Sequence, residues 1–231
     1  MKVTAVIPCY NEERTIADIV RRAKQYCDRV IVVDNMSTDN TIEEAEKETQ
    51  CYNISLCFTK GAGAATREGL IQSLNPVLRG DIIVALDGDG QHNPDEIPKV
   101  VAPIIEDRAD MVLGSRFLNS KTKDMPRYRE FGIGVINWLY NIGNSHRFTD
   151  TQCCMRAFSR KALEVISITE SGFAFSIEML AKAQKAGLRI AEVPVEVIYH
   201  KEYSQNSTSN PITHGIKIIL GILKWRLKCR V

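Results

Sequence analysis

Short apolar runs of strand length alternate with segments of helical character over the first half of the chain. The strand-like runs are residues 3–7, 29–33, 53–58, 81–86 and 111–113. The helix-like segments between them are residues 12–26, 41–49, 64–73 and 94–106, and a further helix is expected to begin near Arg160. A repeated β-α-β pattern predicts a parallel sheet with helices on both faces. We therefore expect an α/β fold with a mostly parallel central sheet.

Polar residues and glycines follow each of the first four strand-like runs. These clusters are residues 8–12, 34–37, 60–63 and 87–91. In open α/β sheets, ligands bind beyond the carboxyl ends of the strands, where such loops meet. The sequence therefore predicts one binding rim, assembled from four loops that are far apart in the chain.

The cluster after the fourth run has the residues expected of a divalent-metal site. Asp87 and Asp89 flank a glycine directly after a strongly apolar strand, and Gln91 follows two residues later. Paired carboxylates suit a hard cation that also binds a diphosphate, and the glycine allows a tight turn close to a ligand. The alternative is a polar turn with two solvated acids. The position beside three other polar strand ends favours the metal.

Two other clusters carry weaker signals for nucleotide binding. Asp34, after the second strand, can accept hydrogen bonds from a base or ribose, or it can cap the next helix. Gly61 and Gly63 precede a helix and resemble a phosphate-binding turn. The turn is neither a G-x-G-x-x-G motif nor a P-loop, because Thr66 stands where the third glycine would be and no Gly-Lys-Ser/Thr run follows.

Charged residues later in the chain can complete the rim. Arg116 follows the fifth strand, where an arginine can contact a diphosphate or an anionic acceptor. Asp150 and Arg156 flank a polar loop, where they either act in the site or serve as a helix cap and an ion-pair partner. The four histidines show no i, i+4 pair, so the sequence predicts no imidazole metal site.

Composition narrows the class of protein. The 231 residues are 44% hydrophobic and 25% charged, and their net charge of +2 does not favour a nucleic-acid binder. The seven cysteines lack C-x-x-C spacing, so we expect reduced thiols. No apolar run reaches the roughly 18 residues of a membrane-spanning helix, and the first run is too short for a signal peptide.

The charge is unevenly spread along the chain. Residues 81–96 contain five acids and no Lys or Arg, whereas residues 201–231 contain six Lys or Arg and one Glu.

The motifs together resemble those of family 2 glycosyltransferases with the GT-A fold, in particular the branch of dolichyl-phosphate mannose synthases and dolichyl-phosphate glucosyltransferases. The matching segments run in order along nearly the whole chain: residues 6–13, 32–39, 87–94, 114–116 and 150–153. The resemblance implies a GDP- or UDP-hexose donor whose base and ribose contact Pro8, Tyr10, Glu12 and Asp34. It also implies that Asp87, Asp89 and Gln91 hold Mg²⁺ or Mn²⁺ against the diphosphate.

Two positions depart from the family pattern. Asn35 stands where a second acid is common after the second strand, and Ala62 stands where a lysine between the loop glycines is usual.

The resemblance further implies a polyprenyl phosphate as the acceptor. Such an acceptor is already an anion, so it needs positive charge more than it needs a general base. Residues 116–130 carry five Lys or Arg against two acids, and by family analogy Arg127 or Arg129 binds the acceptor phosphate, together with Arg116. The expected catalytic residues are Asp89, Arg116 and Asp150, with Asp150 as the base if one is needed.

The C-terminal segment predicts an amphipathic helix. Residues 212–227 combine apolar positions with Lys217, Lys224, Arg226 and a terminal Trp225, a pattern typical of helices that lie in a bilayer interface. We therefore divide the chain into a catalytic domain over 1–203 and a linker with a membrane-surface helix over 204–231. Residues 138–140 (Trp-Leu-Tyr) are a second candidate contact with the membrane. The alternative is a helix that packs on the domain or on another subunit.

The sequence thus predicts an inverting, metal-dependent enzyme that moves mannose or glucose from a nucleotide sugar to a polyprenyl phosphate. We expect it at the cytoplasmic face of a membrane, as a peripheral protein. The alternatives are transfer to a glycan, diacylglycerol or protein, and non-catalytic binding of a nucleotide sugar. The oligomeric state stays open.

Overall fold

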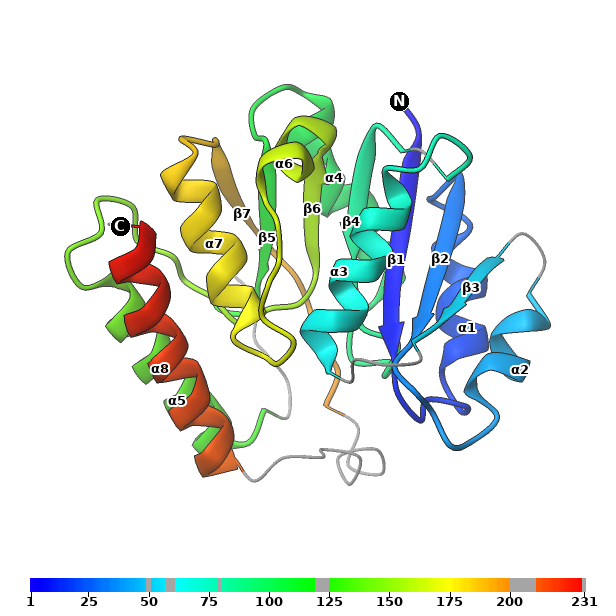
Figure 1. The fold of residues 1–231 in the computed structure, drawn as a ribbon, viewed down its shortest axis with the longest axis horizontal. Helices are drawn as coiled ribbons and strands as arrows, with labels where there is room; N and C mark the ends of the chain where they lie inside the picture. The colour runs from blue at the N-terminus through cyan, green and yellow to red at the C-terminus, as the bar shows by residue number, and fades with distance from the viewer. Residues whose placement is uncertain (49–50, 57–60, 79, 119–124, 200–210, 230–231) are drawn as a thin grey trace.

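The computed structural model describes residues 1–48, 51–56, 61–78, 80–118, 125–199 and 211–229. Within them, one seven-stranded sheet runs through the molecule in the order β3-β2-β1-β4-β6-β5-β7 (Figure 1). Strand β6 is antiparallel to both of its neighbours, and the other pairs are parallel, which confirms a mostly parallel sheet. The strands are β1 (Val3–Cys9), β2 (Arg29–Asp34), β3 (Cys51–Ser55), β4 (Ile82–Ala85), β5 (Met111–Ser115), β6 (Arg156–Ser159) and β7 (Ile190–Pro194).

Helices cover both faces of this sheet (Figure 1). Alternate strand residues point to opposite faces, so that Val6 and Ile31 belong to one hydrophobic core and Ile7 and Val32 to the other. Helices α1, α2 and α4 close the second core, and α3, α6 and α7 close the first. The helices are α1 (Ile16–Ala23), α2 (Thr41–Glu46), α3 (Ala62–Ser73), α4 (Ile97–Ile105, after the 3₁₀ turn Pro94–Glu96), α5 (Arg127–Asn141), α6 (Arg160–Val165), α7 (Phe175–Lys185) and α8 (Pro211–Cys229).

The elements predicted for the first half of the chain are confirmed, although several ends differ. The helix expected from residue 12 begins at Ile16, because the amides of Glu12 and Glu13 donate to Thr41 Oγ1 and Asp39 Oδ2 in the next loop. Four elements of the second half were not predicted, namely β6, β7, α5 and α7. The predicted boundary between 203 and 204 lies outside the described residues, as does the predicted linker (204–211) except for Pro211, which is the first residue of α8.

Helix α8 packs beside α5 and α7 at the end of the sheet that carries β7 (Figure 1). Its residues Ile218, Ile222 and Trp225 are buried in the first core, and Gly221 permits this approach because a Cβ there would lie 2.8 Å from Ala174 Cβ. The expectation that Trp225 faces a membrane is therefore wrong, since only 1% of this residue is exposed. Among the residues described, every helix is too short or too polar to cross a bilayer.

Candidate active site

Hydrogen bonds lock together the loops that follow β1, β2 and β4. The amide of Asn11 donates to Ser37 Oγ (2.9 Å), and the amide of Thr38 donates to Asn11 Oδ1 (2.8 Å). Asn11 adopts a left-handed conformation with a φ of +56°, which asparagine tolerates better than most residues. The hydroxyl of Thr15 donates to the carbonyl oxygen of Gly88 (2.7 Å). Three of the predicted polar clusters therefore meet at one rim.

Asp34 lies buried at this rim, at the carboxyl end of β2. Both of its carboxylate oxygens accept a hydrogen bond from the amide of Ser37 (3.2 Å each). Its alternative role as the cap of the next helix is wrong, because α2 begins at Thr41 with Asn40 as its N-cap. A contact between Asp34 and a base or ribose stays a prediction.

Three carboxylates influence one another where the loops after β1 and β4 meet. Burial, followed by the charges of Asp89 and Asp87, raises the pKa of Glu12 to about 8. Burial and the charge of Asp89 likewise raise the pKa of Asp87 to about 7. Like charges at short range disfavour each other's ionised forms, and a divalent cation would supply the missing opposite charge. The donor set therefore fits a hard metal ion, although no three His, Cys, Asp or Glu side chains of the described residues form a metal-binding group on their own.

Gln91 and His92, shortly after this acidic pair, are held in place by neighbouring residues. The amide of Gln91 donates to Asp89 Oδ1 (2.9 Å), and the carbonyl oxygen of Gln91 accepts from the amide of Ile198 (2.8 Å). His92 is buried, with Nε2 3.8 Å from Asp87 Oδ2. Burial and the nearby Arg116 lower the pKa of His92 to about 4, so its imidazole is neutral at physiological pH.

Arg116 and Asp150 form a buried, two-pronged ion pair. Arg116 Nε donates to Asp150 Oδ2 (2.6 Å), and Nη2 donates to Oδ1 (2.8 Å). Burial alone would lower the pKa of Arg116, but the carboxylate beside it raises that pKa well above its ordinary value. Because both oxygens of Asp150 accept hydrogen bonds from the guanidinium, this carboxylate holds Arg116 in place. The expected role of Asp150 as a general base stays a prediction.

The two glycines of the third loop have a packing role that the sequence did not predict. The carbonyl oxygen of Ser171 accepts from the amides of Gly63 (2.9 Å) and Ala64 (3.2 Å) at the start of α3. A Cβ on Gly61 would lie 2.2 Å from the same oxygen, and a Cβ on Gly63 would lie 2.3 Å from the carbonyl oxygen of Glu170. The phosphate-binding turn expected at Gly61 and Gly63 is therefore corrected, because backbone from the loop before α7 occupies this helix end.

Arg156 also differs from both roles expected for it. It is buried and donates to the carbonyl oxygens of Cys153 (2.9 Å), Ser176 (3.0 Å) and Thr151 (2.8 Å). These bonds join the loop before β6 to the start of α7, so Arg156 is part of the scaffold. Cys153 and the other cysteines of the described residues are free thiols, as expected, and Cys57 lies outside those residues.

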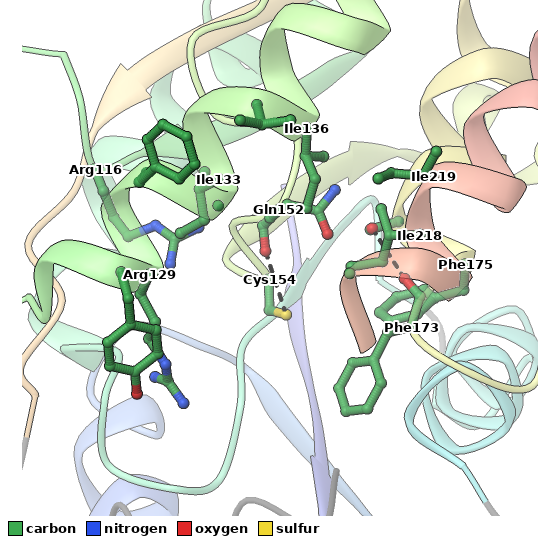
Figure 2. Close-up of a pocket in the computed structure, with 16 residues that line it drawn as sticks. Arg116, Arg129, Ile133, Ile136, Gln152, Cys154, Phe173, Phe175, Ile218 and Ile219 are labelled. Carbon is green, nitrogen blue, oxygen red and sulfur yellow. Dashed lines mark hydrogen bonds between the residues drawn. The ribbon is translucent and has the colours of Figure 1, made fainter. Parts of the chain in front are cut away.

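A pocket of about 410 Å³ lies between α5, α8 and the loop before α7. Figure 2 shows Arg116 and Arg129 on one side of it, and Phe173, Phe175 and Ile218 on the other. At its base, the thiol of Cys154 hydrogen-bonds to the carbonyl oxygen of Gln152 (Figure 2), and Arg116 lies near enough to Asp87 to lower the pKa of that carboxyl. The pocket therefore has a cationic end next to the acidic rim and an apolar body away from it. Its remaining lining includes Tyr128, Phe131, Ile133, Ile136, Gln152 and Ile219.

Of the three arginines expected on the acceptor side, Arg116 and Arg129 line this pocket and Arg127 does not. Arg127 is the first residue of α5 and is exposed. Lys121 and Lys123, which belong to the same basic stretch, lie outside the described residues. The apolar wall was not predicted either, because Phe173 and Phe175 are far from Arg116 in the chain and no local pattern links them.

The sheet order, the helices on both faces and the acidic loop after β4 define a GT-A fold. The structure matches that of glucosyl-3-phosphoglycerate synthase from Mycobacterium tuberculosis with a TM-score of 0.70 and 21% identity, covering 97% of this chain and 78% of that one. At this identity the likeness shows the fold alone.

The chain belongs to glycosyl transferase family 2, whose family model matches residues 4–167. It is 36% identical to a UDP-N-acetylglucosamine–dolichyl-phosphate N-acetylglucosaminyltransferase of Methanococcus voltae, over 96% of this chain and 95% of the relative. It is 27% identical to an undecaprenyl-phosphate mannosyltransferase of Micrococcus luteus, over 100% of this chain and 96% of that relative. The chain is therefore a glycosyltransferase.

Proposed function

We propose that this glycosyltransferase moves a sugar from a nucleotide-diphosphate donor to a polyprenyl phosphate. One observation carries the proposal: the pocket has Arg116 and Arg129 at the end beside Asp87, and apolar side chains beyond them. A lipid phosphate has the same division, with an anionic head and a hydrocarbon tail. The relatives named above act on dolichyl and undecaprenyl phosphates, which supports this acceptor class.

The donor would bind at the rim formed by the loops after β1, β2 and β4. Pro8, Tyr10, Glu12 and Asp34 would surround the base and ribose, as the family resemblance implies. The hydrogen bonds between these loops support this placement, because Asn11 donates to Ser37 and accepts from Thr38 and so holds the ends of β1 and β2 together. Gly61 and Gly63 are left out of the donor contacts because their helix end is already occupied.

Asp87, Asp89 and Gln91 would hold a divalent ion, Mg²⁺ or Mn²⁺, whose other ligands would come from the diphosphate. When bound, such an ion neutralises the charge that develops on the departing nucleoside diphosphate. The raised pKa values of Asp87 and Glu12 support this role, because burial and the neighbouring carboxylates outweigh the opposing influence of Arg116 and Arg156 on Asp87. The solved glucosyl-3-phosphoglycerate synthase was crystallised with Mn²⁺ and UDP.

The acceptor phosphate would lie between Arg116 and Arg129, with its first prenyl units against Phe173, Phe175 and Ile218. A phosphate oxygen then forms the bond to the anomeric carbon as the bond from that carbon to the diphosphate breaks. Attack from the face opposite the leaving group inverts the configuration. The phosphate oxygen carries no proton that must be removed first, so the site needs no general base. Asp150 contributes by holding Arg116 in place.

Exposed apolar side chains around the pocket support a peripheral contact with a membrane. They form one stripe along each of α5 and α8, and the two helices pack side by side. We call these stripes the apolar face; its residues are Tyr128, Phe131 and Trp138 on α5, Ile142 directly after α5, and Ile216, Leu220, Leu223 and Leu227 on α8. Tyr128 and Phe131 also line the pocket, so a lipid held in a bilayer would have a short path to Arg129. We propose that this face lies on the cytoplasmic surface of a membrane.

The decisive experiment measures transfer of radiolabel from UDP-N-acetylglucosamine, UDP-glucose and GDP-mannose to dolichyl phosphate in detergent. We expect label in the organic phase for one of these donors, and only with a divalent ion present. Label that appears solely on a glycan, a protein or diacylglycerol would overturn the lipid-phosphate acceptor. Arg129→Gln and Arg127→Gln form a matched pair on one helix: we expect the first to raise the KM for dolichyl phosphate more than the second.

A further inference from the structure

The segment that follows β7 crosses the acidic rim and is fastened to it. The amide of Ile198 donates to the carbonyl oxygen of Gln91 (2.8 Å), and Val197 forms an isolated antiparallel bridge with His92. The amide of Glu196 donates to Glu96 Oε2 (2.7 Å). These contacts fix the backbone up to Tyr199, the last residue described before the gap at 200–210.

Tyr199 contacts both arginines at the cationic end of the pocket. Its hydroxyl accepts a hydrogen bond from Arg116 Nη1 (3.1 Å). Its ring lies under the guanidinium of Arg129, with 5.7 Å between the ring centroid and Arg129 Cζ. Arg116 follows the end of β5 and Arg129 belongs to α5, so Tyr199 contacts arginines from two different elements.

We propose that Tyr199 is a positioning residue that holds Arg116 and Arg129 at the separation an acceptor phosphate requires. Two guanidinium groups repel each other, and a tyrosine offers each of them a different attraction: an oxygen for one and an aromatic face for the other. Asp150 fixes one side of Arg116 through Nε and Nη2, whereas Tyr199 fixes Nη1. The inference rests on the proposed acceptor, a polyprenyl phosphate.

Two variants separate the two contacts of Tyr199. Tyr199→Phe keeps the ring under Arg129 and removes the hydroxyl from Arg116, whereas Tyr199→Leu removes both contacts. A hydrogen bond to a charged group commonly changes an equilibrium constant by about tenfold or more. We therefore expect about a tenfold rise in the Kd for an acceptor phosphate with Tyr199→Phe, and a larger rise with Tyr199→Leu. Tyr52→Phe on β3 is the matched control, because it removes the same hydroxyl far from the pocket.

The measurement is equilibrium binding of farnesyl phosphate and of farnesol by isothermal titration calorimetry, with the KM for nucleotide sugar as a second readout. Positioning of the arginines predicts weaker binding of farnesyl phosphate alone, with farnesol binding, the donor KM and the Tm unchanged. Equal losses for both ligands, or a parallel rise in the donor KM, would show that Tyr199 only supports the fold and would overturn the inference. Wild-type affinity in Tyr199→Phe would also overturn it, while the proposed function would stand. Failure of the wild type to bind farnesyl phosphate at all would overturn both.

Discussion

Replacing Gly63 with alanine tests whether the glycines before α3 serve packing or phosphate binding. The new Cβ would lie 2.3 Å from the carbonyl oxygen of Glu170 and 2.9 Å from both the carbonyl oxygen of Gly172 and Cβ of Phe175. Ordinary contacts of this kind are about 3.4–4 Å. Two of the three obstacles are backbone, so the loop before α7 must move by about 1 Å as a unit.

The cost of that movement can be set against the gain from helix propensity. Forcing extra atoms into a packed site typically costs about 1–3 kcal/mol, and the shift also strains the hydrogen bond from the Gly63 amide to Ser171. Alanine recovers up to about 1 kcal/mol relative to glycine within a helix, and less in a first turn. We expect Gly63→Ala to lower the free energy of unfolding by about 2 kcal/mol, which corresponds to a fall in Tm of about 4–8 °C for a domain of this size.

Thermal unfolding followed by circular dichroism measures this effect, with Gly134→Ala as the control. Gly134 is an exposed glycine inside α5, and a Cβ there meets nothing within 4 Å. The same substitution should therefore raise stability by about 0.5–1 kcal/mol at Gly134. A Gly63→Ala protein with wild-type Tm but a raised KM for the nucleotide sugar would refute the packing argument and restore the phosphate-binding turn.

Three further predictions address the metal, the apolar face and the pH dependence of folding. Asp89→Ala should abolish turnover while leaving the Tm within a few degrees of the wild type; full activity in the presence of a chelator would contradict the metal role. Leu227→Ser should weaken sedimentation with anionic liposomes by about tenfold, since burying one leucine contributes roughly 1.5–3 kcal/mol, whereas Val77→Ser, at an exposed site elsewhere, should not. The hydrogen-bonded Arg189 lowers the pKa of Asp110, so this carboxylate stabilises the fold above its unfolded-state pKa and loses that contribution as pH falls through the lower folded-state value. Asp110→Asn should therefore unfold more readily than the wild type at pH 7, and a difference that does not shrink as the pH falls below the unfolded-state pKa would refute the assignment.

The first half of the sheet could be predicted from the sequence because its strands are buried on both faces. A strand such as residues 29–33 is then apolar at nearly every position, which is a strong local signal. Strand β6 gives no such signal, since only Ala157 and Phe158 of its four residues are apolar. Its antiparallel insertion between β4 and β5 is decided by tertiary packing, in which the buried Arg156 takes part. A pattern of local runs cannot reveal that arrangement.

Some residues of the candidate site could likewise be predicted from the sequence, and others could not. The acids at residues 34, 87 and 89 could be predicted because they follow strands directly, and the sheet brings strand ends to one edge. The ion pair between Arg116 and Asp150 could not, because nothing in the sequence shows that these two distant side chains would contact each other. Glycine was likewise ambiguous at position 63, where the same residue serves a close backbone approach and a phosphate turn.

Helix α8 shows why its orientation could not be predicted. The buried positions 218, 222, 225 and 229 and the exposed apolar positions 216, 220, 223 and 227 have identical spacing and differ by two residues, or about 200° around a helix. The sequence therefore contains two apolar stripes on opposite sides, and only packing decides which one is covered. Trp225 lies in the covered stripe, where its indole donates to Glu170 Oε1 (2.9 Å).

The ion pair between Asp150 and Arg116 bears on whether the acceptor is a hydroxyl group or a phosphate. An acceptor hydroxyl would require a base within reach, and the carboxylate expected for that task is held by Arg116 through both of its oxygens. Freeing it would leave a buried guanidinium without its partner, a change that costs several kcal/mol. An acceptor that is already an anion avoids this cost and uses the ion pair as it stands, because Asp150 then holds the positive charge where the phosphate must bind. The ion pair that engages both oxygens of Asp150 is therefore an argument for a phosphate as the nucleophile.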